Sequence, residues 1–315
     1  MIIRDHFSQS ELKEFSARSD FHGWLAVVSN WGIICAAFAL VAFAANPLTL
    51  VLALILLGGR HLGLGVLMHE CGHGTLFKTK RLNRFVGKWL CAAPVNYRLD
   101  DYMKNHLSHH RKAGSEADPD LHRYRGYPVS KYSLRRKLLR DLSGRTTLSF
   151  LKNSLAKNRV FSEGENGDRR FNLSQFLIQF HAPLIMNLVL LGFLTAAGFP
   201  EFYLLWLLAY FSIYMVFSRI RNLAEHACVP DLFDPNPLMH TRTTHAAWWE
   251  RLTFAPNCVN YHLEHHLLPS VPKYRLAAFH RALQRKGLLD NADIESGYFP
   301  FMRRLVSSEE QRESL

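Results

Sequence analysis

Histidine is the residue type in this sequence whose spacing points most directly to chemistry. Seventeen histidines occur in 315 residues, and eight of them fall into three short groups, HECGH at His69–His73, HLSHH at His106–His110 and HLEHH at His262–His266. Side chains at i, i+3 and i+4 share one face of a helix, so each group is predicted to direct its imidazoles to one side. Zinc normally takes four ligands, so eight imidazoles fit two metal ions better than one. Imidazole binds iron, zinc and copper alike, and ligand type alone leaves the metal open.

Each group taken singly has a simpler explanation. A lone HExxH motif arises by chance or belongs to a zinc protease, with His69 and His73 as ligands and Glu70 as the base. A lone HxxHH motif is most simply a coincidence or a surface patch. The argument for a metal centre is that all three groups occur in one chain, on one side of the membrane segments predicted below.

Three uncharged stretches predict the elements that must position these histidines. Trp24–Gly59 has 36 residues without Asp, Glu, Lys or Arg, Asn172–Pro200 has 29 and Phe202–Ser218 has 17. The apolar core of a bilayer is about 30 Å thick and needs about 20 residues of helix. The first stretch is therefore predicted to form two spans that turn at Asn46-Pro47, and each of the others one span. The expected fold class is an all-α integral membrane protein with four transmembrane helices and a cytosolic histidine-rich helical cap.

The basic residues predict the side of the membrane on which the cap lies. The net charge is +12, and the 38 lysines and arginines are divided between residues 1–23 (3), 60–170 (23) and 219–315 (12). Loops rich in Lys and Arg stay in the cytoplasm, so both termini and all three histidine groups are predicted to be cytoplasmic. The chain 1–315 is expected to be one membrane domain made of a tail (1–23), a hairpin (24–59), a segment with the first two groups (60–171), a second hairpin (172–218) and a segment with the third group (219–315).

Composition argues against several other classes of protein. Hydrophobic residues make up 48% and charged residues 20%, which excludes a disordered chain. Five scattered cysteines without a CxxC pair exclude a disulfide scaffold. No nucleic-acid-binding module is recognisable, so the basic charge is assigned to an anionic membrane surface and no nucleic-acid partner is expected. Residues 1–23 are polar and do not resemble a cleaved signal peptide; Ser8 and Glu11 predict a capping box at the start of a short helix.

The three groups, their order and the spans between them resemble the membrane fatty acid desaturase and hydroxylase superfamily, whose members carry three histidine boxes of these forms. We therefore call the groups boxes 1, 2 and 3. The resemblance extends from about Trp24 to Pro272, and the stretches HECGHGTLF and NYHLEHHLLPSVP are similar to acyl-lipid desaturases in particular. It implies a non-haem centre of two iron ions, with O2 as co-substrate, that removes hydrogen from an unactivated chain.

The resemblance also implies two further site residues. The family has another histidine before box 3 and, four residues earlier, an asparagine that holds a metal-bound water; the stretch RNLAEH supplies Asn222 and His226 at this spacing. On its residues alone, a histidine at the end of a membrane helix is as often an interfacial or capping residue as a ligand. No catalytic residue beyond the metal site is predicted. The predicted metal site consists of His69, His73, His106, His109, His110, Asn222, His226, His262, His265 and His266.

Residues next to the boxes have two interpretations each. Glu70, Glu225 and Glu264 either accept a hydrogen bond from a metal-binding imidazole or belong to a solvated helix face. Asp118-Pro-Asp120 either supports the site or forms a turn, and the composition favours the turn. The histidines outside the boxes are assigned to the surface or to the surroundings of the site: His61, His122, His240, His245 and His280.

The expected function is O2-dependent desaturation of a long fatty-acyl chain. Box 1 is HExxH and not the HxxxxH of acyl-CoA delta-9 enzymes, which favours a lipid-linked chain. Hydroxylation or other oxygenation of a lipid or carotenoid is the alternative, and a zinc protease is a distant one. The sequence has neither an HPGG haem motif nor a ferredoxin or Rieske cysteine pattern, so a separate donor of the ferredoxin or cytochrome b5 type is expected. The expected membrane is a bacterial inner membrane or the endoplasmic reticulum.

Overall fold

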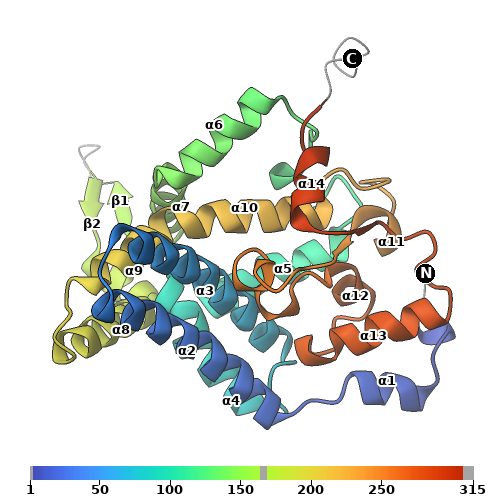
Figure 1. The fold of residues 1–315 in the computed structure, drawn as a ribbon, viewed down its shortest axis with the longest axis horizontal. Coiled ribbons are helices and arrows are strands. Elements are labelled where there is room, and N and C mark those ends of the chain that lie inside the picture. Colours follow the sequence, from blue (N-terminus) through green and yellow to red (C-terminus); the bar gives the residue numbers. More distant parts are fainter. Residues whose placement is uncertain (1–2, 164–168, 308–315) are drawn as a thin grey trace.

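The computed structural model describes residues 3–163 and 169–307, and this part of the chain is mostly helical (Figure 1). Two pairs of very short strands, which the sequence pattern does not predict, accompany the helices; β1 pairs antiparallel with β2, and β3 pairs parallel with β4. The strands are β1 (Phe161–Glu163), β2 (Arg169–Phe171), β3 (Thr243–Thr244) and β4 (Ile294–Glu295). The α-helices are α1 (Gln9–Phe15), α2 (Asp20–Phe43), α3 (Pro47–His73), α4 (Lys80–Val86), α5 (Leu99–Lys112), α6 (Lys131–Leu142), α7 (Arg145–Lys157), α8 (Leu173–Ala196), α9 (Phe202–Phe211), α10 (Ile213–His226), α11 (Pro237–His240), α12 (His262–Leu267), α13 (Lys273–Arg285) and α14 (Tyr298–Arg304).

The helices α2 and α3 form the first predicted hairpin. Asn46 precedes α3, and its side-chain oxygen accepts hydrogen bonds from the backbone N–H groups of Leu48 (3.0 Å) and Thr49 (3.1 Å). An asparagine in this position satisfies N–H groups that have no partner inside the helix, and Pro47 at the first helical position has no N–H to satisfy. The turn predicted at Asn46-Pro47 is confirmed. The helix α3 continues beyond Gly59, the predicted end of the span, and carries box 1.

The helices α8, α9 and α10 form the second predicted hairpin. Ser212 separates α9 from α10 because its backbone angles, φ −120° and ψ −83°, lie outside the helical range. The helix α10 then continues past Ser218, the predicted end of the fourth span, to His226. Within the described residues, four helical segments are long and apolar enough to cross a membrane, as predicted. The side of the membrane on which the cap lies stays a prediction.

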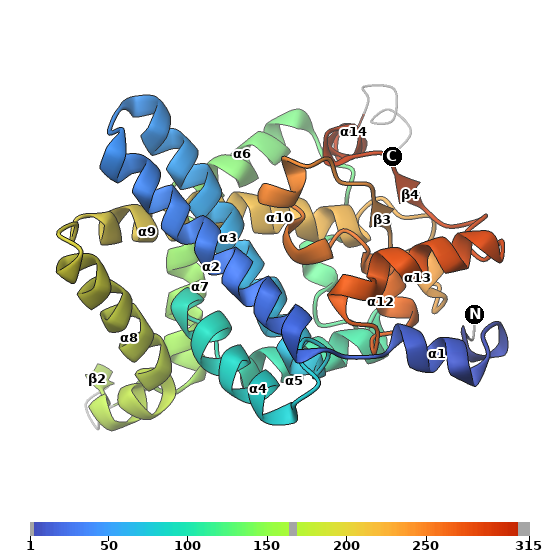
Figure 2. The ribbon, with the colours of Figure 1, turned by 60° about the horizontal axis from the view of Figure 1, so that its bottom comes forward.

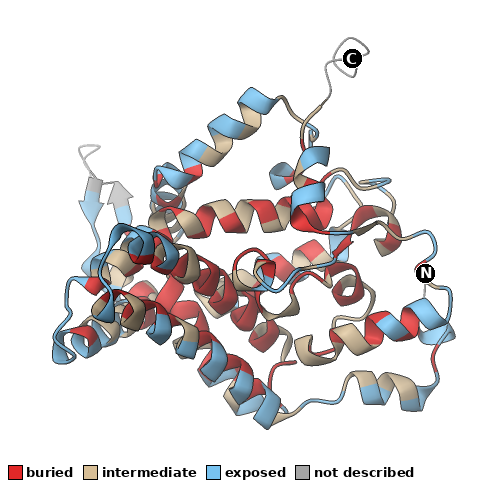
Figure 3. Cartoon of the chain, in the orientation of Figure 1, coloured by how far each residue is buried: buried red, intermediate tan, exposed pale blue. Residues whose placement is uncertain are grey.

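The two membrane helices that end in histidines meet the cap near the centre of the molecule. The helices α3 and α10 pack against each other, and the end of α3 also packs against α5 (Figures 1 and 2). Figure 3 shows buried residues concentrated along α3 and α10, whereas the outer sides of α2 and α8 are exposed. The exposed side of α8 is apolar, as the contact of a membrane helix with lipid requires; it includes Leu177, Ile178, Leu188, Val189 and Phe193.

The N-terminal helix α1 begins with a local capping box and packs on the cap through an aromatic contact. The side chain of Ser8 accepts a hydrogen bond from the Glu11 N–H, and the Glu11 carboxylate accepts one from the Ser8 N–H, so the predicted capping box is confirmed. Phe15, the last residue of α1, packs on Phe279 of α13 with ring centroids 5.2 Å apart. The N-terminal helix therefore lies against the segment that follows box 3.

Candidate metal centre

Box 1 forms the last turn of α3. His69 and His73 are four residues apart and therefore lie one turn apart on the same face of the helix. The helix ends at His73 because Gly74 adopts φ +68°, and the Gly74 N–H donates to the carbonyl of Cys71 (3.0 Å). Glycine reaches this left-handed conformation without the strain that a Cβ causes. Both imidazoles of box 1 thus project from the cap end of a membrane helix.

Boxes 2 and 3 each divide their histidines between two sites, which corrects the expectation that all imidazoles of a box point to one side. In α5, His106 and His110 face one site, and His109 faces the other. In α12 the division is reversed, since His265 joins the first site while His262 and His266 join the second. Neighbouring residues of an α-helix differ by about 100° in direction, so positions i+3 and i+4 lie on opposite sides of position i.

Among residues 3–163 and 169–307, nine histidines form two compact groups whose ring nitrogens lie within 4.8 Å of one another. In the first group, four distances between facing Nε2 atoms are 2.9 to 3.0 Å. In the second, the Nε2 atoms of His226 and His262 are 2.8 Å apart. The five-histidine group consists of His69, His73, His106, His110 and His265. The four-histidine group consists of His109, His226, His262 and His266.

The helix α10 carries both residues that were predicted from the RNLAEH stretch. His226 is the last residue of α10 and belongs to the four-histidine group. Asn222 lies one turn earlier, and its Nδ2 donates to the carbonyl of Ser218 (3.0 Å). The structure thus brings together the nine predicted histidines. For Asn222 it shows this backbone hydrogen bond, and a role toward a metal stays a prediction.

Hydrogen bonds on the outer side of the rings indicate which ring nitrogen faces each group. The Nδ1 atom of His226 lies 3.0 Å from the carbonyl oxygen of His240. A carbonyl only accepts, so Nδ1 carries the proton, and the Nε2 atom of the neutral ring carries a lone pair. His109 Nδ1 lies 2.9 Å from a carboxylate oxygen of Asp118. Lone pairs converging at such short distances repel one another unless a cation lies between them, and rings oriented in this way are typical of metal-binding histidines. The donor set therefore fits a metal ion in each group.

Burial keeps the imidazoles of the cap in their metal-binding form. Burial, reinforced by neighbouring histidines, lowers the pKa of His106, His262 and His265 well below the usual range. Burial is also the main cause that lowers the pKa of His110 to about 3. A histidine must be neutral to bind a metal, and these rings are neutral at physiological pH.

The three glutamates beside the boxes are buried, which excludes the solvated-face interpretation. Their exposed fractions are 3% for Glu70, 3% for Glu225 and 0% for Glu264. Glu225 is close to a ring of the four-histidine group, because its Oε1 atom lies 3.5 Å from His262 Nδ1. The same oxygen lies 2.5 Å from Nε of Arg221, one turn earlier on α10. The carboxylate of Glu225 therefore lies between the half-buried guanidinium of Arg221 and a metal-binding candidate.

Glu264 and Glu70 have their closest partners outside the boxes. One oxygen of Glu264 lies 2.6 Å from His280 Nδ1, and the other accepts from the hydroxyl of Thr243 (2.6 Å). His280 is buried and reaches α12 from α13, so it is not a surface histidine. Glu70 accepts from the backbone N–H of Lys273 (3.0 Å) at the start of α13. Both carboxylates therefore fasten boxes 1 and 3 to α13.

Asp118 both forms the expected turn and contacts the site. One carboxylate oxygen accepts from the Asp120 N–H (2.9 Å), as in a turn, and from His109 Nδ1. Burial alone would raise the pKa of Asp118, but hydrogen bonds from His109 and from the hydroxyl of Tyr124 hold this pKa below its usual range. Tyr124 was not predicted, and its ring also stacks on His226 with centroids 4.8 Å apart. No sequence motif singles out this tyrosine.

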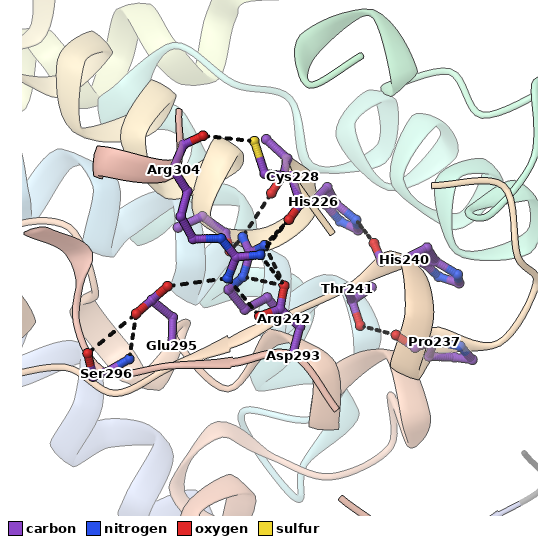
Figure 4. A network of polar contacts seen from close by, with 12 residues as sticks. His226, Cys228, Pro237, His240, Thr241, Arg242, Asp293, Glu295, Ser296 and Arg304 are labelled. Carbon is purple, nitrogen blue, oxygen red and sulfur yellow. Dashed lines mark hydrogen bonds and ion pairs between the residues drawn. The ribbon is translucent and has the colours of Figure 1, made fainter. Parts of the chain in front are cut away.

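Two further residues near His226 lie in the network of Figure 4. His240 is buried, and its backbone carbonyl accepts a hydrogen bond from His226 Nδ1. Of the two places expected for this histidine, the surface and the surroundings of the site, the structure shows the second. Arg242 is only 1% exposed and hydrogen-bonds to Asp293. Sequence reasoning missed Arg242 because it belongs to no motif and its carboxylate partner is 51 residues away.

Comparison with known proteins agrees with this geometry. The sequence matches the family described as fatty acid desaturase over residues 45–293. It is 26% identical over 263 residues to a protein named dihydrorhizobitoxine desaturase from Bradyrhizobium elkanii, a match that covers 81% of this chain and 73% of that protein. It is 33% identical over 90 residues to a protein named beta-carotene ketolase from Paracoccus sp. (strain PC1), a match that covers 28% of this chain and 36% of that protein.

These matches decide between the enzyme classes that the boxes allow. A zinc protease would use box 1 alone, whereas the family match takes in all three boxes and most of the chain. The protein is therefore an oxidoreductase, and the protease alternative is wrong. Together with the four apolar helices, the match identifies an integral membrane protein. From the arrangement of its histidines and the extent of the match, the chain belongs to the fatty acid desaturase family.

Proposed function

We propose that the two histidine groups hold two iron ions and that the protein is an O2-dependent desaturase of a long fatty-acyl chain, most simply one linked to a lipid. The observation that carries the proposal is the convergence of nine imidazoles in two adjoining groups, with His110 of one group stacked on His266 of the other at 4.4 Å between ring centroids. Bound there, the two ions would supply the oxidising chemistry that removes hydrogen from an unactivated methylene.

The residues of this chain hold and shield such a site. The ring nitrogens supply neutral donors, and Asp118 and the His240 carbonyl orient two of the rings from behind. Six of the nine histidines are buried, among them His69, His109 and His262 at 7%, 3% and 4% exposed, so most of the site is shielded from bulk water. A cavity of about 10 Å³, the room of one water-sized molecule, adjoins His69, His262 and His265 and so touches both groups.

Desaturation is favoured over oxygenation by the extent of the matches. The relative with the longer match is named a desaturase, and the one with the shorter match a carotene ketolase. Oxygenation of a carotenoid is therefore the second candidate, and it rests on the shorter match. Electrons are proposed to come from a separate donor of the ferredoxin or cytochrome b5 type. We place the cap and both termini on the cytoplasmic side of a bacterial inner membrane or of the endoplasmic reticulum, because the basic residues are concentrated there.

Two measurements test the proposed function. Metal analysis of the detergent-purified chain, grown with ample iron, should give two iron ions per chain. Analysis of acyl chains from a host that lacks its own desaturase should show a new double bond with the wild-type chain and with His122→Ala, an exposed histidine outside the boxes. The double bond should be absent with His109→Ala. New alcohols, or ketones in a carotene-producing host, would favour oxygenation instead, and a single metal ion that survives removal of His109 and His265 would contradict the two-metal site.

A further inference from the structure

The C-terminal end of α10, where His226 lies, is held by an unusual partner. The last carbonyls of an α-helix have no partner inside the helix. Here Arg242 supplies one: its Nη1 atom donates to the carbonyls of Ala224 (3.0 Å) and Ala227 (2.9 Å), and its Nη2 atom donates to that of Cys228 (2.8 Å). The guanidinium thus caps the turn on both sides of His226. A cation in this position also opposes the negative end of the helix dipole.

Arg242 is itself fixed on every side. Its Nε and Nη2 atoms donate to one carboxylate oxygen of Asp293, at 2.9 and 2.6 Å, so all five N–H groups are used when the three carbonyls are included (Figure 4). The ring of Phe301 lies below the guanidinium, 4.8 Å from ring centroid to Cζ. A side chain that is 1% exposed and fully hydrogen-bonded has little freedom to move.

The backbone next to Arg242 holds the imidazole of His226 as well. The His240 carbonyl, two residues earlier, accepts from His226 Nδ1 (3.0 Å), and this contact turns Nε2 toward the four-histidine group. The residue after Arg242, Thr243, begins β3 and donates its hydroxyl to Glu264 of box 3. The segment 240–243 therefore connects the two helices, α10 and α12, that supply three of the four rings in that group.

We propose that Arg242 is a positioning residue of the metal centre, which fixes the final turn of α10 so that His226 stays within bonding distance of the ion in the four-histidine group. An imidazole nitrogen must lie about 2 Å from a divalent metal, so a small tilt of this turn removes His226 from the site. The proposal rests on the proposed function only in that the four-histidine group binds a metal ion. Arg242 touches no reacting atom and acts through α10 and His226.

Arg304 provides a matched control. It donates to both oxygens of Asp293, at 2.9 and 3.0 Å, and to the Cys228 carbonyl (2.6 Å), so it shares two partners with Arg242. The carbonyls of Ala224 and Ala227 accept from Arg242. Comparing Arg242→Met with Arg304→Met therefore separates two effects: the loss of the hydrogen bonds to the end of α10, and the general loss of hydrogen bonds to Asp293 and Cys228.

The experiment measures iron per chain during dialysis of the detergent-purified protein against increasing EDTA, together with the thermal unfolding temperature of the same samples. The wild-type chain and Arg304→Met should retain two ions under conditions in which Arg242→Met retains one. The second ion should leave Arg242→Met at an EDTA concentration about 10- to 100-fold lower, the usual effect of losing a residue that supports a metal ligand. Selective loss of one ion distinguishes positioning from general destabilisation, which would release both ions together.

Retention of both ions by Arg242→Met, or loss of both in step with a lower unfolding temperature, would overturn the proposal. If Arg242→Met does not fold, Arg242→Lys replaces it, because lysine keeps the positive charge at the helix end but lacks the forked donors of arginine. This variant should release one ion at an EDTA concentration between those of the wild type and of a chain without the side chain. Retention of both ions at the wild-type level by Arg242→Lys would contradict the role of the guanidinium hydrogen bonds. A wild-type chain that holds two ions but produces no alkene would contradict the proposed desaturation while leaving the comparison of Arg242 variants decisive. A wild-type chain without bound metal would overturn both proposals.

Discussion

The imidazole of His109 illustrates what a single residue needs in order to bind a metal. It must be neutral, its Nε2 atom must face the ion, and its ring must not rotate. Asp118 meets the last two needs by accepting from Nδ1 at 2.9 Å, and the turn that contains Asp118 is tied down by the Asp120 N–H. For His226, the His240 carbonyl acts in the same way. Acceptors of this kind hold the tautomer and the orientation of a metal-binding ring.

Removal of the Asp118 carboxylate should weaken the binding of one of the two metal ions. We expect Asp118→Ala to lower the affinity of the four-histidine group for iron by about 10- to 100-fold, because His109 loses the acceptor behind its ring. Chelator titration of the purified chain, followed by metal analysis, measures this change. The control is Asp120→Ala, since the Asp120 carboxylate contacts Asn105 (3.2 Å) and Arg123 (3.4 Å) instead of a box histidine. Equal metal retention by the two variants would exclude this role for Asp118.

At the scale of the elements, the rotation of two short helices decides which ion each histidine serves. The helix α5 gives two rings to the five-histidine group and one to the four-histidine group, and α12 does the reverse. The HxxHH pattern suits this division because its adjacent histidines point about 100° apart. The HxxHH pattern looks like a ligand set for one metal site, but it allows one helix to supply ligands to two sites.

Double variants test this division. The variants His109→Ala and His110→Ala should each lose one metal ion, although the residues are adjacent in α5. We expect His109→Ala combined with His226→Ala to retain one ion, since both residues belong to the four-histidine group. His109→Ala combined with His110→Ala should retain none, because each group loses a donor. Iron counted per chain gives the answer, with His122→Ala as the unaffected control; equal counts in the two double variants would contradict the assignment.

At the scale of the whole molecule, the metal centre joins parts of the chain that are far apart in sequence. Its rings come from α3 and α10, which end the two membrane hairpins, and from α5 and α12 in the cap. An ion in the five-histidine group would join the first hairpin to the cap, and an ion in the four-histidine group would join the second hairpin to the cap. Because such a site does not exist in the unfolded chain, the binding free energy adds to the stability of the fold.

Removal of the metal should therefore lower the stability of the entire protein. With free iron at about 100 times its dissociation constant, one site adds about 2.7 kcal/mol to the free energy of unfolding. We expect the thermal unfolding temperature in detergent to fall on chelation and to recover with ferrous iron but not with Mg²⁺, which prefers oxygen ligands. An unfolding temperature that does not respond to chelation would show that the rings hold no stabilising ion.

The sequence by itself determined the features that depend on local patterns. The uncharged stretches predicted four spans because a bilayer sets a minimum length, and Asn46-Pro47 predicted the first turn because these residues favour helix starts. The boxes and the RNLAEH stretch identified the nine histidines, since helical spacing and family resemblance are both legible in the chain.

Only the tertiary structure decided how those residues are combined. The division into five and four rings follows from how α5 and α12 are rotated by packing, which a repeated HxxHH does not encode. The contacts of Tyr124 with His226 and of Arg242 with Asp293 and the end of α10 join segments that no local pattern relates. Sequence periodicity reports the direction of a side chain around its own helix axis, whereas its partners depend on where the other helices lie.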